Sequence, residues 1–244
     1  MTLSGHHTML GGVKLPYTKR VEYINSTGGA YINTDKLILP TNIVYLDLQY
    51  NTTRPPDNAA MQNGFWDTAS GQPYLVFTSQ SNTFYGYSSN YRSNRCYAGR
   101  SNTNRHAVKF DLAGDAFYLD GVKATEFGAG IEKEATVPFF LFARNLRGSG
   151  AQHYCSEKLY EFYIENYGEK TMHLIPVVDL EGQARMFDLV SGTYPAHYGT
   201  FTSGPDVGGG YSRQCVKRSH RRSSRPSARF WSAAHSPRRW GVAA

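Results

Sequence analysis

Three acidic residues lie close together in the segment LIPVVDLEGQARMFDLVSG, which spans residues 174–192. They are Asp179, Glu181 and Asp188. Enzymes that hydrolyse glycosides use two carboxyl groups, about 5 to 5.5 Å apart in retaining enzymes and about 6.5 to 9.5 Å apart in inverting ones. Because residues two apart on a strand share a face, Asp179 and Glu181 have the spacing for such a pair.

The surroundings of these acids favour a turn over an active site. Gly182 follows Glu181 directly, and polar residues separate two apolar runs, which is the pattern of a solvent-exposed connection between strands. A general acid needs a pKa raised by burial, and an exposed turn does not provide it. We therefore predict that these acids face water and that the segment holds no catalytic residue.

Nothing else in the chain predicts an enzyme. The G-x-S-x-G, Walker and H-E-x-x-H motifs are absent. Cys96, Cys155 and Cys215 form no C-x-x-C or Cys/His cluster, so neither a zinc site nor a disulfide framework is indicated. Free thiols are favoured, although a bridge between Cys96 and Cys155 stays open. Four histidines have no recognisable partner, and we interpret them as surface or packing residues: His106, His153, His173 and His197.

The basic residues are unevenly distributed. Nine of the 26 Lys and Arg residues, and none of the 19 acidic residues, lie in 211–244, so residues 1–210 carry 17 basic and 19 acidic residues. That part therefore has no electrostatic footprint for nucleic acid. We predict a disordered basic tail over 207–244. It is either an arm for nucleic acid or another anionic surface or, as its Arg/Ser/Pro/Trp composition favours, a non-native extension.

The beginning of the chain predicts a flexible leader over residues 1–16. It has no basic start followed by an apolar run, so no secretory signal is visible. No stretch approaches the ~18 apolar residues that a membrane helix needs, so we expect no membrane insertion.

Residues 17–206 predict one all-β domain. Short aromatic and β-branched runs alternate with Gly, Asn, Asp and Ser turn signals. NIVYLDLQY (42–50) predicts a strand with one buried face, VPFFLFARN (137–145) a continuous strand buried on both faces, and Asp120-Gly121 a type I′ hairpin turn. The polar segments 51–64 and 90–105 predict surface loops. The expected architecture is a two-sheet antiparallel β-sandwich.

Several segments resemble one family. EYINSTGGAYINT is similar to its recurring opening, and LFARN, KLYEFYI, LIPVVD, GQARMFDLVSG and GTFTSGP follow in the order of its closing part. The family is that of the concanavalin A-like, laminin G-like jelly-roll domains, which include lectins and glucanases and occur in phage structural proteins and bacterial surface proteins. The resemblance spans about Tyr17 to Pro205, and in the middle it extends only to the strand pattern.

The resemblance implies two antiparallel sheets packed face to face. By analogy of fold, it also implies recognition of carbohydrate or a cell surface more often than catalysis. Glucanases of this fold carry an E-x-D-x-x-E strand, which this sequence lacks. Some relatives bind calcium through loop Asp and Asn side chains. Asp35, Asp67 and Asn63 have suitable groups, but their spacing does not single them out, and no cofactor is indicated.

Aromatic rings and hydrogen-bonding side chains are what a sugar site needs, on loops or on a concave face. Tyrosines alternate with Asn and Arg in residues 85–105, and Trp66 is a second candidate. The alternatives are that the tyrosines pack across a sheet and that the tryptophan lies in the core. The predicted ligand-binding residues are Trp66, Tyr85, Tyr87, Tyr91, Asn94 and Arg95.

These observations predict a non-enzymatic module that binds a glycan or cell-surface polysaccharide, on a virion or on an extracellular or bacterial cell surface. Two alternatives stay open. One is a structural or assembly domain that binds virion proteins or further copies of itself. The other is a glycoside hydrolase with an unusual site.

Overall fold

The computed structural model describes residues 9–10, 13–52, 61–66, 74–80, 83–89, 95–98, 103–126, 131 and 133–207. All of them belong to one compact unit, Met1–Gly210. Over these residues the chain forms strands and no helix, arranged as two largely antiparallel sheets, so the predicted all-β sandwich is confirmed. Within the same residues no helix is long and apolar enough to span a bilayer. The predicted basic tail, apart from Val207, lies outside them.

One sheet, here called sheet I, includes the strands that carry most of the predicted ligand-binding residues. Its order is β10 (Arg95–Ala98), β9 (Thr83–Ser89), β8 (Tyr74–Gln80), β7 (Met61–Trp66), β14 (Phe140–Leu141), β5 (Tyr31–Asn33) and β20 (Ala196–Tyr198). In addition, β15 (Arg144–Leu146) pairs in parallel with β7 and antiparallel with β16 (Ala151–Gln152).

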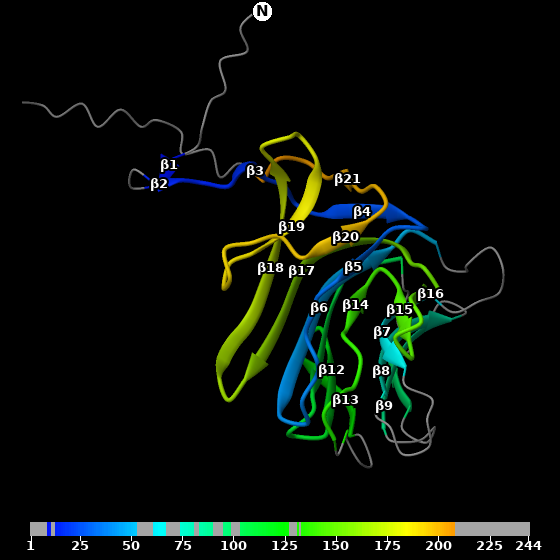
Figure 1. Ribbon diagram of the computed structural model, residues 1–244. Helices are drawn as coiled ribbons and strands as arrows, with labels where there is room; N and C mark the ends of the chain where they lie inside the picture. The colour runs from blue at the N-terminus through cyan, green and yellow to red at the C-terminus, as the bar shows by residue number, and fades with distance from the viewer. Residues whose placement is uncertain are drawn as a thin grey trace, which may run out of the picture. The chain divides into compact units, whose positions relative to one another are not determined.

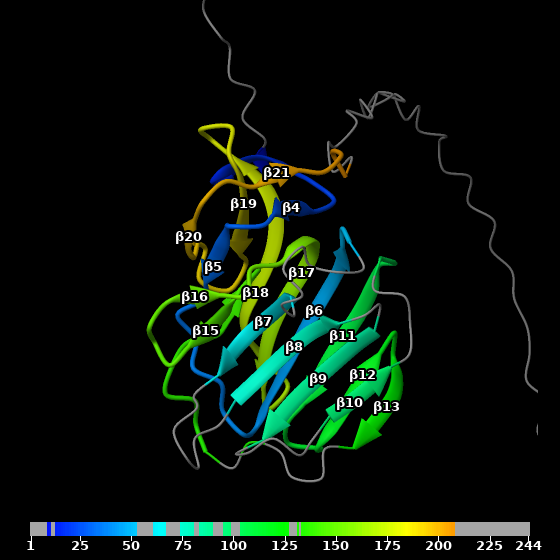
Figure 2. The same ribbon diagram turned by 90° about the vertical axis from the view of Figure 1, so that its right-hand side faces the viewer.

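The other sheet, sheet II, contains the longest strands. Its order is β13 (Val122–Glu126), β12 (Ala116–Leu119), β11 (His106–Asp111), β6 (Asn42–Tyr50), β17 (Ser156–Asn166), β18 (Glu169–Asp179) and β19 (Ala184–Asp188). Three short strands extend it: β3 (Tyr17–Arg20) on β18, β4 (Ile24–Thr27) on β17, and β21 (Thr202–Ser203) on β4. Figure 1 shows the β17–β18 hairpin on the left and β7–β9 of sheet I on the right, and Figure 2 shows β7, β8 and β9 side by side. Within the predicted leader, β1 (Met9–Leu10) pairs with β2 (Val13–Lys14).

The two sheets bury one apolar interior between them. Along β6 every second side chain is fully buried, beginning with Val44 and Leu46, while Tyr45 and Asp47 lie on the opposite, outer face. Phe65 of sheet I and Phe162 of sheet II belong to the same buried cluster. The alternation of period two in the sequence therefore places one face of each sheet in the core and the other outside.

The Asp120-Gly121 hairpin is confirmed. Its two residues have φ of 53° and 77°, and Leu119 pairs with Val122 across the turn. Asp and Gly tolerate the positive φ that a type I′ turn requires, so this local prediction depended on no distant contact.

Two predictions about local structure are wrong. VPFFLFARN is not one strand, because Phe142 has a φ of +63° and breaks the segment into β14 and β15. After this break Arg144 pairs with Gly64 of β7, and its guanidinium contacts the ring of Trp66. The segments predicted to be loops also contain β10 and the start of β7, because cross-strand pairing holds Arg95–Ala98 and Met61–Gly64 in sheet I.

Candidate functional site

Aromatic side chains cross the outer face of sheet I from β20 to β7. Tyr198 stacks on Tyr31 with ring centroids 4.5 Å apart and an interplanar angle of 10°, and Tyr31 stacks on Phe140 at 5.0 Å. Phe140 pairs with Gly64, two residues before Trp66 on β7. Phe140 is buried, at 6% exposed, and Tyr31 is half-buried and packs against the core cluster, whereas Tyr198 and Trp66 do not belong to that cluster. We call Tyr198, Tyr31, Phe140 and Trp66 the aromatic stripe.

The β20 end of the stripe is open to solvent. Tyr198 is 50% exposed, and Tyr154, which lies 6.2 Å from Tyr31, is 39% exposed. Burial, together with these two neighbouring tyrosines, raises the pKa of Tyr31 above its ordinary value, so its hydroxyl stays protonated and can donate a hydrogen bond. A cavity of about 270 Å³ adjoins this end, and its polar lining includes Asn33, Asp35, Lys36, Ser191 and Thr193.

The β7 end of the stripe carries a cation. The Arg144 guanidinium carbon lies 4.9 Å from the centroid of the Trp66 ring, which is a cation–π contact. Arg144 is 8% exposed, and burial lowers its pKa to about 10. Trp66 is half-buried and is absent from the core cluster. Trp66 was predicted from the sequence as a ligand-binding residue. Its neighbour Arg144 was not.

Three other predicted ligand-binding residues belong to the same sheet but not to the stripe: Tyr85, Tyr87 and Arg95. Tyr87 pairs with Arg95, and Tyr85 lies two residues before Tyr87 on β9. Strand β8 separates β9 from β7, so these backbones lie about 10 Å from the strand of Trp66. Tyr91 and Asn94 lie outside the described residues.

The acidic segment forms two turns, but its aspartates do not face water as predicted. Asp179 and Asp188 are 4% and 2% exposed, whereas Glu181 is exposed. Oδ1 of Asp179 accepts hydrogen bonds from the backbone N–H of Glu181 (2.9 Å) and Gln183 (2.8 Å). The two aspartates are buried because they satisfy turn N–H groups, so they hold the chain's shape and have few lone pairs left for a substrate.

Replacing Asp188 by Ala is expected to cost about 2 to 4 kcal/mol of unfolding free energy. Its carboxylate accepts bonds from the backbone N–H of His173 (2.8 Å), Val190 (3.1 Å) and Ser191 (3.3 Å). Removing the Asp188 carboxylate leaves these three N–H groups without an acceptor at a buried site. Urea unfolding measures the loss, and Glu181→Ala, at an exposed position, is the control that should change stability by no more than about 0.5 kcal/mol. Equal losses in both variants would contradict the structural role.

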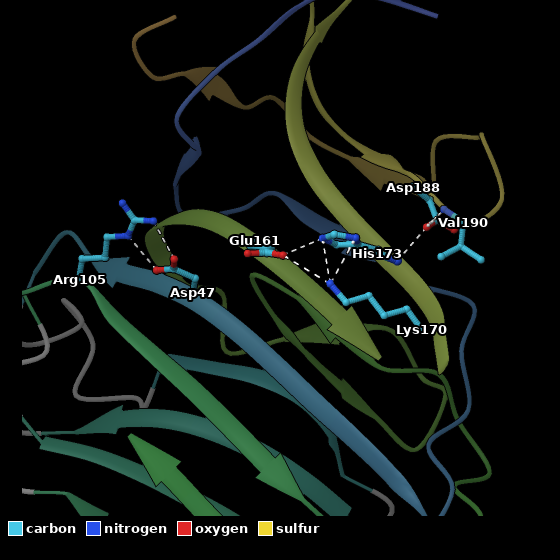
Figure 3. Close-up of polar contacts among 7 residues, drawn as sticks. All are labelled: Asp47, Arg105, Glu161, Lys170, His173, Asp188 and Val190. Carbon is cyan, nitrogen blue, oxygen red and sulfur yellow. Dashed lines mark hydrogen bonds and ion pairs between the residues drawn. The ribbon is translucent and has the colours of Figure 1, made fainter. Parts of the chain in front are cut away.

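A second polar constellation lies on the outer face of sheet II (Figure 3). The register of β17 against β6 shifts at Tyr160, and this bulge makes both Tyr160 and Glu161 face outward. Glu161 thereby lies directly opposite Asp47. Arg105 donates two hydrogen bonds to Asp47, at 2.9 and 2.7 Å, and its guanidinium lies 3.8 Å from the centroid of the Tyr160 ring. In the sequence, this bulge corresponds to the interrupted alternation of apolar and polar residues in SEKLYEFYIEN.

Basic side chains also surround the second carboxylate of this pair. Oε1 of Glu161 lies 2.6 Å from Nε2 of His173 and 3.9 Å from Nζ of Lys170. Next to them Tyr45 and Tyr163 stack with centroids 4.6 Å apart. The carboxylates of Asp47 and Glu161 therefore both contact basic side chains. Such an arrangement is typical of a structural network or of a binding surface.

The histidines do have partners, which the sequence did not reveal. Nδ1 of His106 lies 2.7 Å from a carboxylate oxygen of Asp120, and Nδ1 of His197 accepts a hydrogen bond of 2.7 Å from Arg185. Burial and the neighbouring Arg185 lower the pKa of His197. The sequence shows no partner for His106 or His197, because Asp120 and Arg185 lie 14 and 12 residues away and only the fold brings them close.

One carboxyl group lies deep in the core. Glu157 is fully buried, and burial raises its pKa to about 8, although the amide of Asn63 donates a hydrogen bond of 3.0 Å to Oε2. Cys155 and Tyr50 lie beside it, and their pKa values are raised by burial as well. Cys155 is a free thiol, which excludes the Cys96–Cys155 bridge. Glu157 has no exposed surface, so its raised pKa is a consequence of burial in the core.

Of the side chains with groups suitable for calcium, Asn63 and Asp35 lie in different surroundings. Asn63 points into the core, where Oδ1 accepts a hydrogen bond of 2.6 Å from the N–H of Phe142. Asp35 is exposed and bonded to Asn33, and Asp67 lies outside the described residues. Among the residues that the structure describes, no group of three or more His, Cys, Asp or Glu side chains could hold a metal ion.

Comparison with known proteins adds no relative. No protein-family model and no curated protein matches this chain. The resemblance to concanavalin A-like domains therefore stays a prediction, and the functional argument rests on the geometry of the two outer faces.

Proposed function

We propose that this protein is a non-enzymatic carbohydrate-binding module that holds a glycan on the outer face of sheet I, on a virion or a cell surface. The aromatic stripe is the observation that carries the proposal. Aromatic rings offer flat apolar area together with a polar tip, and sites for small polar ligands combine such rings with a few hydrogen-bonding groups. The fold-level resemblance supports the same reading by analogy.

The dimensions of the stripe suit a chain of sugars better than a single one. Four neighbouring strands, β20, β5, β14 and β7, carry it, which corresponds to about 14 Å across the sheet. Polar groups accompany the rings at both ends, with Asn33 and Asp35 near β20 and Arg144 near β7. An extended oligosaccharide laid across the strands would contact the exposed rings at the β20 end and pass over the buried Phe140 towards Trp66.

Tyr198→Ala is expected to weaken glycan binding at least about tenfold, because aromatic anchors dominate such surfaces. A glycan array identifies the ligand, and titration calorimetry of wild type and variant measures the loss. Tyr167→Ala removes a tyrosine that is 84% exposed in the β17–β18 turn, away from the stripe, and should bind like wild type. No binding to any glycan on the array, or equal affinities of the Tyr198→Ala and Tyr167→Ala variants, would count against the proposal. Light scattering that shows a defined oligomer together with a silent array would favour an assembly domain.

The hydrolase alternative has one observation in its favour, the facing carboxylates Asp47 and Glu161 of sheet II. We favour binding over hydrolysis because each of these carboxylates is hydrogen-bonded to a basic side chain. Release of reducing ends from polysaccharides, abolished in Glu161→Gln, would establish the hydrolase instead.

A further inference from the structure

Arg144 is a buried cation without an anion. Its side chain is 8% exposed, and Nε is buried without a hydrogen bond. Among the described residues no carboxylate pairs with its guanidinium, and its contact there is the face of Trp66. Burying a charge without a partner costs free energy. Natural proteins therefore rarely bury an arginine without an opposite charge beside it. The position therefore has a cost that no opposite charge on a described residue offsets.

A second buried polar atom without a hydrogen-bond partner lies on the strand next to Arg144. Gly64 is the register partner of both Arg144 and Phe140, so these two side chains lie beside the same point of β7. Gln62 lies two residues before Gly64 on β7, is 7% exposed, and has a buried Oε1 without a hydrogen-bond partner. An unpaired donor of Arg144 and an unpaired acceptor of Gln62 thus lie on two paired strands at the end of the stripe.

We propose that Arg144 binds a carboxylate of the ligand, so that the glycan recognised by the stripe is an acidic one, built with uronic-acid-type sugars. This inference rests on the proposed function of sheet I. The planar guanidinium matches a carboxylate through two parallel N–H···O bonds. The ring of Trp66, which the guanidinium contacts, packs against the same sugar. A neutral sugar would leave the arginine unpaired, so the site discriminates against neutral chains.

The test compares polygalacturonate with the same polymer after reduction of its carboxyl groups. Wild type is expected to bind the acidic polymer at least about tenfold more tightly than the reduced one. Arg144→Gln should lose this preference while keeping the weaker binding to the reduced polymer. Arg20→Gln, which removes an exposed positive charge from β3 of sheet II, is the matched control and should behave like wild type.

A second measurement, the melting temperature without ligand, distinguishes a ligand-binding role of Arg144 from a purely structural one. Without ligand, Arg144→Met is expected to melt at the same temperature as wild type or higher, because it removes an unpaired buried charge and keeps the apolar stem. A marked fall in melting temperature would identify Arg144 as a structural residue and overturn the inference. Equal binding of both polymers by wild type, or an unchanged preference in Arg144→Gln, would also overturn it while the glycan-binding function stands. If a full glycan panel, acidic chains included, shows no binding, both proposals fall.

Discussion

Replacing Glu157 by Gln is expected to stabilise the protein in alkaline solution and to change its stability little in acid. The folded state holds a proton on Glu157 up to a pH of about 8, whereas the unfolded chain releases it near 4.5. The folded state therefore binds more protons between these values. The contribution of this group to stability is complete below pH 4.5 and is lost as the pH rises to about 8, at about 1.4 kcal/mol per pH unit.

Glutamine has no proton to lose, and its amide has nearly the shape of the neutral acid. Asn63 can still donate to its oxygen as it does to Oε2 of Glu157. At pH 9 we expect Glu157→Gln to exceed wild type by about 3 to 5 kcal/mol in unfolding free energy. At pH 5 the two should agree to within about 1 kcal/mol.

Urea unfolding at a series of pH values from 5 to 9 measures this difference. Glu181→Gln is the matched control, because Glu181 is exposed on a turn, and its profile should run parallel to that of wild type. Parallel profiles for Glu157→Gln and wild type would show that Glu157 is ionised in the folded state at neutral pH. That outcome would contradict the argument from burial.

Gly64→Ala is expected to be among the most destabilising single substitutions in the chain, at about 4 kcal/mol. A Cβ at this position would lie 2.1 Å from the carbonyl oxygen of Leu75 on the neighbouring strand β8, and the residue has a φ of +128°. Backbone cannot rotate aside as a side chain can, so β7 and β8 would have to separate. The substitution should also disturb the positions of Phe140 and Arg144, which pair with this residue.

Gly28→Ala is the control that separates the steric clash of the added Cβ from the strain of a positive φ. Gly28 also has a positive φ, +109°, but no atom lies within 4 Å of the Cβ that would be added. It should therefore cost only the strained dihedral, about 1 to 2 kcal/mol. Thermal and urea unfolding of the two variants measures the difference, and equal losses would mean that the close approach to Leu75 relaxes easily.

The sequence predicted local structure well wherever the cause was local. The strand at Asn42–Tyr50 and the hairpin at Asp120-Gly121 depend on alternation and turn chemistry within a few residues. It also predicted the turn after Asp179. It failed on the burial of that aspartate, because polar residue types suggest exposure and only the backbone donors collected around the carboxylate reveal otherwise.

The candidate site was predictable only in part. Trp66 stands out in any sequence as a large aromatic residue, and it lies at one end of the stripe. Tyr31 and Tyr198 come from opposite ends of the domain and meet because β5 pairs with β20. Arg144 reaches its position because the backbone breaks at Phe142, within a segment that reads as one continuous apolar strand. Neither a distant pairing nor a left-handed phenylalanine leaves a signal in local composition.

The sequence by itself determined that this protein is a β-sandwich, since a period of two and short-range turn signals specify strands wherever they are placed. Only the tertiary structure decided which side chains gather on each outer face. Strand partners far apart in the chain set the rows of neighbours, and irregularities at Tyr160 and Phe142 decide which side chains of those rows point outward. A one-residue shift in register exchanges the two faces of a strand, so the site depends on contacts across the whole domain.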